Sequence, residues 1–285
     1  MTHDLMCADR SERGKLRVTG EQRAWFLHQI LTKAFEDIRP GKAREAAMIS
    51  GKGRMIGYLE ALATDDAILA HFERALDPAL PDAMRAYLFA TRAELTSVTE
   101  DFGLVLVAGE GWAEAAVSVS EPGLIQASRG IGAPGGYLWA ERGEASRVIA
   151  GLERAGARRV SDEELEAMRV VGGAPRWGHE MTERSLPPEI RLDRWALDYD
   201  KGCYLGQEVM AKIHFRGRVT KLLQRLALSE PATVGDEVRD ADEQPLGRIT
   251  SAAGTAALAV LKTTVGPGDV VTVAGAKAEI LEEVW

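Results

Sequence analysis

The residues best suited to chemistry lie in one short segment, Lys201-Gly202-Cys203-Tyr204-Leu205-Gly206-Gln207-Glu208. The segment places a thiol between two glycines, near a lysine and just before a helix-like run at residues 207–213. A helix N-terminus and a nearby ammonium group both favour the thiolate, which is the reactive form of cysteine. Cys203 is therefore predicted to be a nucleophile, a redox thiol or a transient metal ligand. The alternative is an inert cysteine buried in the core.

Charged residues on either side of this segment are candidates for binding an anion. Arg216 and Arg218 flank Gly217, and a guanidinium group matches a carboxylate or phosphate with paired hydrogen bonds. Glu189 follows two prolines that stiffen the chain and would present its carboxylate to a ligand. A solvated strand face explains the arginines equally well, and a surface loop explains Glu189. Within the segment itself, Gln207 and Glu208 are secondary site candidates.

Cysteine spacing and charge exclude several classes of function. Cys7 and Cys203 form no CxxC or Cys/His pattern, so no self-contained metal site is predicted. The net charge of −8 argues against binding nucleic acid over the whole surface, because such binding depends on many Lys and Arg contacts to phosphates. Direct nucleic-acid binding is not expected, although the basic run at residues 212–225 leaves an RNA-binding module as a third hypothesis.

Hydropathy along the chain gives no sign of a membrane segment. No apolar stretch approaches the roughly 18 to 20 residues that cross a bilayer. Residues 1–13 are polar and contain no hydrophobic signal region. We therefore expect a cytoplasmic protein with no membrane partner.

The elements that must position these residues mix helices and strands without strict alternation, which predicts an α+β fold. A hairpin is predicted at residues 46–62 around the turn Ser50-Gly51-Lys52-Gly53. Ser161 and Glu164 fit a capping box at the start of a helix at residues 161–171. The remaining predictions are helices at residues 21–34, 82–89 and 145–155, and strands at residues 16–19, 93–99 and 104–108.

The pattern changes after Arg225, where Val, Ile, Thr and Ala alternate and glycines recur at short intervals. This pattern is typical of a small antiparallel β-barrel. The chain is therefore predicted to divide into an N-terminal α+β region at residues 1–222, with two interleaved subdomains, and a barrel at residues 223–285.

The Cys203 segment resembles the K-G-C-[FY]-x-G-Q-[ED] signature of the YgfZ family, and the resemblance continues through residues 209–218. Residues 18–32 and 180–192 are similar to further segments of this family and of the related glycine-cleavage T-protein, and residues 246–252 are similar to a strand pair of the C-terminal barrel. The resemblance implies a three-domain ring around a folate-sized channel, with Cys203 at its rim. It also implies tetrahydrofolate or a derivative as the ligand.

The same resemblance implies a role in assembly or repair of iron–sulfur clusters in client enzymes, including one that thiomethylates tRNA. The alternative is a tetrahydrofolate-dependent one-carbon transferase or demethylase.

Two stretches depart from the aminomethyltransferases. Where those enzymes carry a G-G-x-x-D-D segment, this chain has Gly53-Arg54-Met55-Ile56-Gly57-Tyr58 and neither aspartate. A carboxylate stabilises or deprotonates the iminium-like species of that reaction, so aminomethyltransferase activity is not expected. Val171 stands where a glutamate would bind the pterin, and the loss of that carboxylate is expected to weaken folate binding by about 1–3 kcal/mol.

Overall fold

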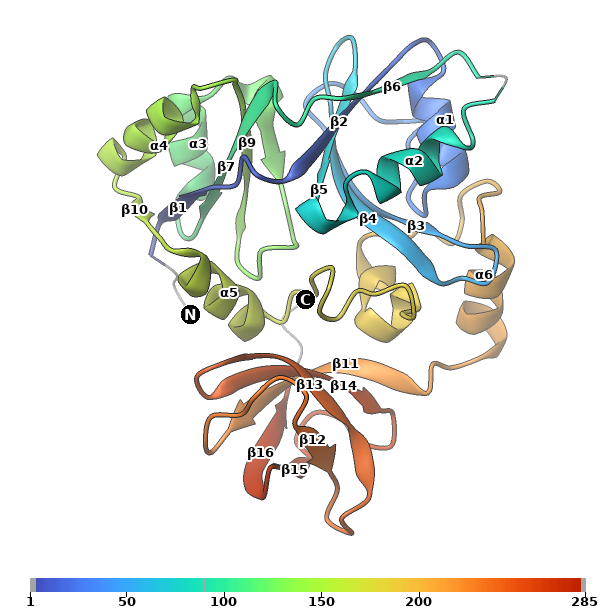
Figure 1. Cartoon of the computed structure of the whole chain (residues 1–285), viewed down its shortest axis with the longest axis vertical. Helices are drawn as coiled ribbons and strands as arrows, with labels where there is room; N and C mark the ends of the chain where they lie inside the picture. The colour runs from blue at the N-terminus through green and yellow to red at the C-terminus, as the bar shows by residue number, and fades with distance from the viewer. Residues whose placement is uncertain (1–3, 90, 283–285) are drawn as a thin grey trace.

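A computed structural model describes residues 4–89 and 91–282. It places two five-stranded sheets, each with its own helices, above a closed β-barrel (Figure 1). The predicted α+β class and the C-terminal barrel are both confirmed. Residues 1–3 and 283–285, at the outer ends of the two predicted regions, lie outside the described residues.

One sheet has the order β3-β4-β5-β2-β6 and forms the upper right of Figure 1. Its elements are β2 (Gly14–Thr19), α1 (Arg23–Ile30), β3 (Ala43–Ile49), β4 (Met55–Ala63), β5 (Ile68–Phe72), α2 (Ala79–Arg85) and β6 (Glu94–Ser97). The predicted hairpin is confirmed: β3 pairs antiparallel with β4 around a turn in which Gly53 has φ +74. Leu16, Phe26 and Leu59 belong to the core between this sheet and its helices.

Two predicted helices in this part had the wrong bounds. The predicted helix at residues 21–34 is shorter, because Leu31 leaves it to form a β-bridge with Met48. The Thr32 hydroxyl then hydrogen-bonds the carbonyls of Ala47 and Ala196. The predicted helix at residues 82–89 begins earlier, at Ala79, and its Pro81 lies in the first turn, where a missing N–H costs no intrahelical bond.

The second sheet has the order β10-β1-β7-β9-β8 and forms the upper left of Figure 1. Its strands are β1 (Met6–Asp9), β7 (Phe102–Ala108), β8 (Ile125–Ala127), β9 (Gly135–Glu141) and β10 (Arg158–Arg159). Helices α3 (Trp112–Val119) and α4 (Ala145–Arg154) pack against β7 and β9. Because β1 and β2 are consecutive in the chain, residues 9–14 run directly from one sheet to the other.

Helix α5 (Asp162–Gly172) connects the sheets to the barrel. Its predicted capping box is confirmed: the Ser161 side chain accepts from Glu164 N, and the Glu164 carboxylate accepts from Ser161 N. Beyond α5 the chain forms the short helices η3 (Pro187–Ile190) and η4 (Leu192–Arg194), and then α6 (Gln207–Arg216). Helix α5 packs against barrel strands, so it fixes the barrel relative to the rest of the chain.

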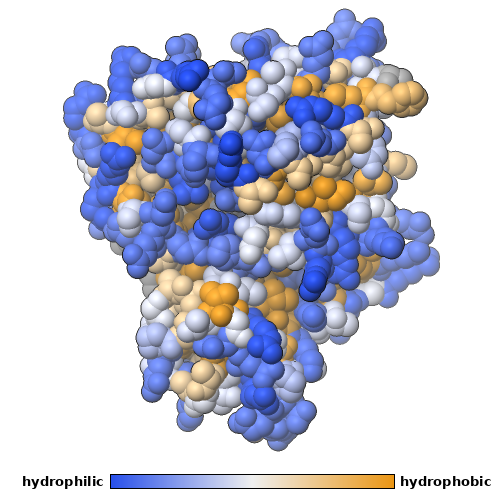
Figure 2. Space-filling view, viewed as in Figure 1, coloured by the Kyte–Doolittle hydropathy of each residue, from blue (hydrophilic) through white to orange (hydrophobic). Residues whose placement is uncertain are grey.

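The barrel closes in the order β11-β14-β13-β12-β15-β16. Its strands are β11 (Lys221–Leu228), β12 (Glu237–Arg239), β13 (Pro245–Ala253), β14 (Ala256–Lys262), β15 (Val270–Val273) and β16 (Ala276–Leu281). Leu226, Ile249 and Ile280 are among the side chains that fill it. Figure 2 shows hydrophilic residues over most of the viewed face, with smaller apolar patches over the sheets and near the junction of the barrel and the sheets. No helix in the described part of the chain is long and apolar enough to cross a membrane.

Candidate functional site

A cavity of about 630 Å³ lies among the two sheets, α5 and the segment that follows α5. Apolar side chains, among them Leu106, Ile131 and Met168, share its wall with charged ones. The charged and phenolic groups that line it are Asp9, Arg10, Glu12, Arg13, Tyr58, Glu60, Glu73, Arg74, Tyr137, Asp162, Glu166, Arg169 and Arg176. This mixture suits a polar ligand with a planar or apolar body.

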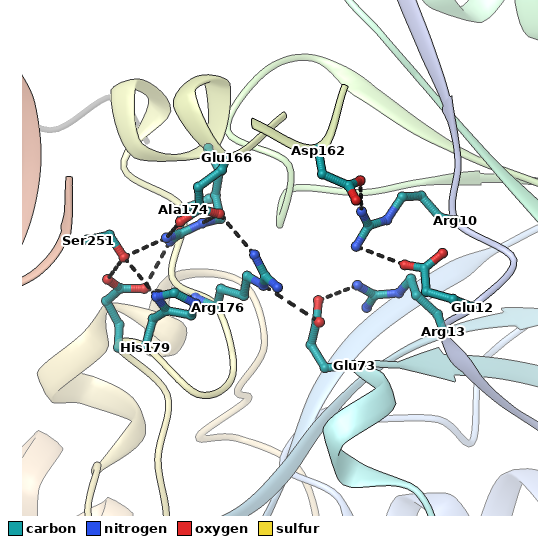
Figure 3. Close-up of polar contacts among 12 residues, drawn as sticks. Arg10, Glu12, Arg13, Glu73, Asp162, Glu166, Ala174, Arg176, His179 and Ser251 are labelled. Atoms are coloured by element: carbon teal, nitrogen blue, oxygen red, sulfur yellow. Dashed lines mark hydrogen bonds and ion pairs between the residues drawn. The ribbon is translucent and has the colours of Figure 1, made fainter. Parts of the chain in front are cut away.

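Buried ionic groups join α5 to the barrel beside this cavity (Figure 3). Arg169 donates to Glu180 Oε2 at 2.9 Å and to Ser251 Oγ at 2.6 Å. The Ser251 hydroxyl donates to Glu180 Oε1 at 2.6 Å, and the Glu180 side chain is fully buried. A buried ion pair needs such complete hydrogen bonding to offset its desolvation. The triad therefore holds α5, the segment after it and β13 in one arrangement.

The row of alternating charges continues from α5 to the first sheet. Arg176 Nη1 lies 3.0 Å from Glu166 Oε2, and Arg176 Nε lies 3.6 Å from Glu73 Oε2. Arg13 Nη1 lies 2.5 Å from Glu73 Oε1, and Arg13 Nη2 lies 3.6 Å from Glu60 Oε1. Although burial opposes it, hydrogen bonding to Arg169 and the charges of both arginines lower the pKa of Glu166 to about 2. One side of the cavity is thus a continuous ionic chain.

Tyr58 and Glu45 separate this cavity from a second one. The Tyr58 hydroxyl donates to the Glu45 carboxylate, and Trp195 Nε1 donates to Tyr58 Oη at 3.3 Å. Tyr58 lines the larger cavity, whereas Glu45 lines a cavity of about 570 Å³. Tyr58, at the end of the stretch that lacks both aspartates, thus contributes a phenol to the wall between the two cavities.

Glu60 is a cavity carboxyl group that the sequence analysis missed. Its side chain is 3% exposed, and its Oε2 has no hydrogen-bond partner among the described residues. Burial first, and then the charge of Glu45, raises the pKa of Glu60 to about 8, although Arg13 opposes the shift. The signal was present in the sequence: Glu60 interrupts an apolar run and, two residues after Tyr58 on β4, faces the same side of the sheet.

The Cys203 segment forms a firmly held loop with an exposed thiol. Cys203 is exposed, so the description of an inert buried cysteine applies to Cys7, which is fully buried in β1. The buried ammonium of Lys201 donates to the carbonyl oxygens of His28, Leu31 and Lys33 at 2.5, 2.6 and 3.1 Å. Lys201 therefore anchors the loop to the last turn of α1 and to the chain that follows it.

Other residues of the segment complete this anchoring. Gly206 has φ +79, and a Cβ there would lie 2.5 Å from the Ser50 carbonyl oxygen, so only glycine fits. Gln207 donates to the Lys201 carbonyl at 3.2 Å, and the buried Tyr204 ring lies 4.8 Å from the Lys201 ammonium. For Gly202 an added Cβ would meet His28 Nε2 at an ordinary 3.5 Å. Exposed Glu208 pairs with Lys212 at 2.6 Å on the surface of α6.

The other predicted site residues, Glu189, Arg216 and Arg218, are not among the residues that line the larger cavity. The Glu189 carboxylate accepts from Leu186 N at 3.0 Å and lies 3.7 Å from Arg54, so it caps η3. Arg216 is the exposed last residue of α6, and the alternative of a strand face is wrong for it. Arg218 lines a third cavity, of about 390 Å³, near Asp193 and His214.

Neither Cys203 nor Val171 is among the residues that line the 630 Å³ cavity. No cluster of three or more metal-ligating side chains occurs in residues 4–89 and 91–282.

Comparisons with known proteins relate the chain to aminomethyltransferases, although no family model matches it. It is 25% identical over 271 residues to the chloroplastic "Putative transferase At1g60990" of Arabidopsis thaliana, covering 88% of this chain and 62% of that protein. It is 26% identical over 226 residues to the aminomethyltransferase of Mycobacterium leprae, covering 71% of this chain and 60% of that enzyme. The chain thus spans about three fifths of the length of both relatives.

The fold itself matches a solved structure. Glycine cleavage system aminomethyltransferase T from Bartonella henselae superimposes with a TM-score of 0.86, covering 99% of this chain and 86% of that one. At 15% sequence identity, this likeness shows the fold alone. The chain is therefore homologous to aminomethyltransferase-like proteins and has the T-protein fold, as the sequence predicted.

Proposed function

We propose that this chain is a cytoplasmic, YgfZ-type accessory protein that assembles or repairs iron–sulfur clusters in client enzymes through Cys203. The observation that carries the proposal is the exposed thiol on an anchored loop. A thiol that meets a cluster on another protein must be accessible and held in place. A thiol that served only a small molecule in the 630 Å³ cavity would line that cavity, and Cys203 does not.

A reduced folate is the ligand proposed for the larger cavity. Its volume of about 630 Å³ lies within the range of ordinary small-molecule sites, and its wall offers aromatic and apolar surface as well as charge. The predicted weakening of folate binding rests on Val171, which does not line this cavity. Among the carboxyl groups of its wall, Glu60 has a buried oxygen with no hydrogen-bond partner among the described residues.

A second candidate function, a tetrahydrofolate-dependent one-carbon transferase or demethylase, is favoured by Glu60. Sequence reasoning found no acid or base for such chemistry, whereas the structure supplies a buried carboxyl group in the cavity. Turnover of methylenetetrahydrofolate or of a methylated amine by the pure protein would support this function. Absence of turnover with both classes of donor would count against it.

The proposal is tested with a purified tRNA-thiomethylating iron–sulfur enzyme that is losing its cluster in air. We expect the wild-type protein to slow the loss of cluster absorbance or to restore it in the presence of iron and sulfide. Cys203→Ala should have no effect. Cys7→Ala is the matched control, because it removes the buried thiol and leaves Cys203 in place. Equal protection by Cys203→Ala and wild type would contradict the proposed role of the thiol.

A further inference from the structure

Two polar atoms on the wall of the 630 Å³ cavity lack hydrogen-bond partners among the described residues: Glu60 Oε2 and Arg176 Nε. Buried polar atoms are nearly always paired, and leaving one unpaired costs about 1–3 kcal/mol. Both residues belong to the same ionic chain and are linked through Arg13 and Glu73. The two atoms are therefore free to form hydrogen bonds with a ligand in the cavity.

The contacts of Glu60 indicate which of its oxygens carries the proton. Oε1 faces Arg13 Nη2 at 3.6 Å, and a guanidinium group favours an acceptor oxygen. Burial, followed by the charge of Glu45, raises the pKa of Glu60 to about 8, so its carboxyl group is mainly protonated at pH 7. The proton then belongs on Oε2, the oxygen without a partner. Both unpaired atoms are therefore hydrogen-bond donors.

The surroundings of Glu60 leave it as the group that titrates between pH 7 and 9. The titratable groups that face it are Arg13, Glu45, Tyr58, His71, Glu73 and Tyr137. Burial raises the pKa of both tyrosines and lowers that of His71 far below its usual value, so all three stay neutral. Although burial opposes both shifts, Tyr137 and then Glu73 raise the pKa of Arg13, and the Arg13 cation lowers that of Glu73.

Glu45 is the remaining neighbour. Burial raises its pKa, but its carboxylate accepts from the Tyr58 hydroxyl and from Arg129 N at 2.6 Å. Both bonds favour the ionised form of Glu45. Glu60 lines the 630 Å³ cavity and Glu45 does not, so a change of ligand affinity across this pH range is assigned to Glu60.

We propose that Glu60 and Arg176 are specificity-determining residues of this cavity, donating from Oε2 and Nε to two acceptor atoms of an uncharged heterocycle. The inference rests on the proposed reduced-folate ligand, whose pteridine ring offers a carbonyl oxygen and ring nitrogens as acceptors. Trp177 and Met168 provide apolar wall for such a ring. Ionisation of Glu60 removes its donor, so the ring loses one of its two proposed hydrogen bonds and binds more weakly.

The test measures the affinity of the pure protein for 5-formyltetrahydrofolate at pH 7 and pH 9. These values lie one unit on either side of about 8, so the neutral fraction of Glu60 falls from about 90% to about 10%. Wild type should bind about tenfold more weakly at pH 9. Glu60→Gln should bind equally at both values, because a carboxamide keeps a donor. Arg176→Gln should bind more weakly at both pH values while keeping the tenfold fall.

Glu12→Gln is the matched control, since it makes the same change at another carboxylate on the cavity wall, one that is paired with Arg10. This variant should bind the probe about tenfold more weakly at pH 9 than at pH 7, as wild type does. The inference is overturned if wild-type affinity is the same at both pH values, if Glu60→Gln shows the same fall, or if the probe does not bind. None of these outcomes depends on Cys203, so failure here is distinguishable from failure of the proposed cluster function.

Discussion

The Cys203 loop and the wall of the central cavity stabilise buried charge in different ways. Lys201 has backbone carbonyl oxygens as acceptors, all from one short stretch of chain. In the cavity wall, arginines alternate with carboxylates from β4, from the chain after β5, from α5 and from the segment after α5. A cation bound by nearby carbonyls fixes a loop, whereas a shared ionic chain fixes the positions of whole domains. Substitutions at Lys201 should therefore loosen one loop, whereas substitutions in the ionic chain should destabilise the whole fold.

Breaking the triad beside the cavity is expected to have the largest effect. Arg169→Ala leaves Glu180 as a buried unpaired carboxylate, and loss of one partner of a buried ion pair costs about 3–5 kcal/mol. Urea unfolding measures the change. Arg158→Ala, which breaks only an exposed pair with Glu164, is the control and should leave the free energy of unfolding nearly unchanged. If both variants lost only a little unfolding free energy, the structural role of the triad would be refuted.

The stability of the protein should depend on pH through Glu60. The unfolded chain releases this proton near pH 4.3, whereas the folded protein keeps it until about pH 8. Stability from the retained proton is fully present at low pH and is lost as pH rises through this window, by about 1.4 kcal/mol per pH unit. Urea unfolding between pH 5 and 8 should show a shallower dependence for Glu60→Gln than for wild type. The same pH dependence of unfolding free energy in both proteins would show that Glu60 does not cause it.

Substitution of Lys201 should loosen the Cys203 loop more than it destabilises the rest of the fold. Lys201→Met removes the donor to the carbonyl oxygens of His28 and Leu31, and buried acceptors left unpaired cost about 1–3 kcal/mol. We expect faster proteolytic cleavage near residue 203, with the cavity and its ligand affinity unchanged. Lys212→Met, on the exposed side of α6, is the control. Equal cleavage rates in the two variants would show that Lys201 does not anchor the loop.

The smallest effect is expected at Glu208, although it lies in the same sequence segment. Its partner Lys212 is also exposed, and such pairs contribute little. Glu208→Gln should therefore leave the thermal unfolding midpoint unchanged in 0.1 M and 1 M salt alike, within error. A clear fall in the midpoint at the lower salt concentration would show that the segment depends on this carboxylate for more than surface charge.

Sequence reasoning worked where the determinants were local. The turn at Gly53 and the Ser161 capping box each depend on a few consecutive residues, and both were predicted. It failed where distant segments decide the outcome. Helix α1 ends early because Leu31 bridges to Met48 on β3, a contact that helical periodicity does not contain.

The same contrast between local and distant determinants applies to the Cys203 segment and the cavity. The Cys203 segment is contiguous and could be read directly, whereas the cavity wall is assembled from side chains far apart in the chain. Arg13, Glu73 and Arg176 carry no motif, and their pairing appears only when the sheets and α5 come together. Sequence comparison pointed to position 171, which does not line the cavity, whereas Glu60 lines it and has a carboxyl oxygen with no hydrogen-bond partner among the described residues.

The most direct test of the account is the activity of an iron–sulfur enzyme in cells that lack this protein. Activity is measured after restoration with wild type or with Cys203→Ala at matched abundance. We predict that wild type restores the activity and Cys203→Ala does not. Equal restoration by both would show that the exposed thiol is dispensable for cluster maintenance. If deletion leaves the enzyme fully active, the accessory function itself is contradicted.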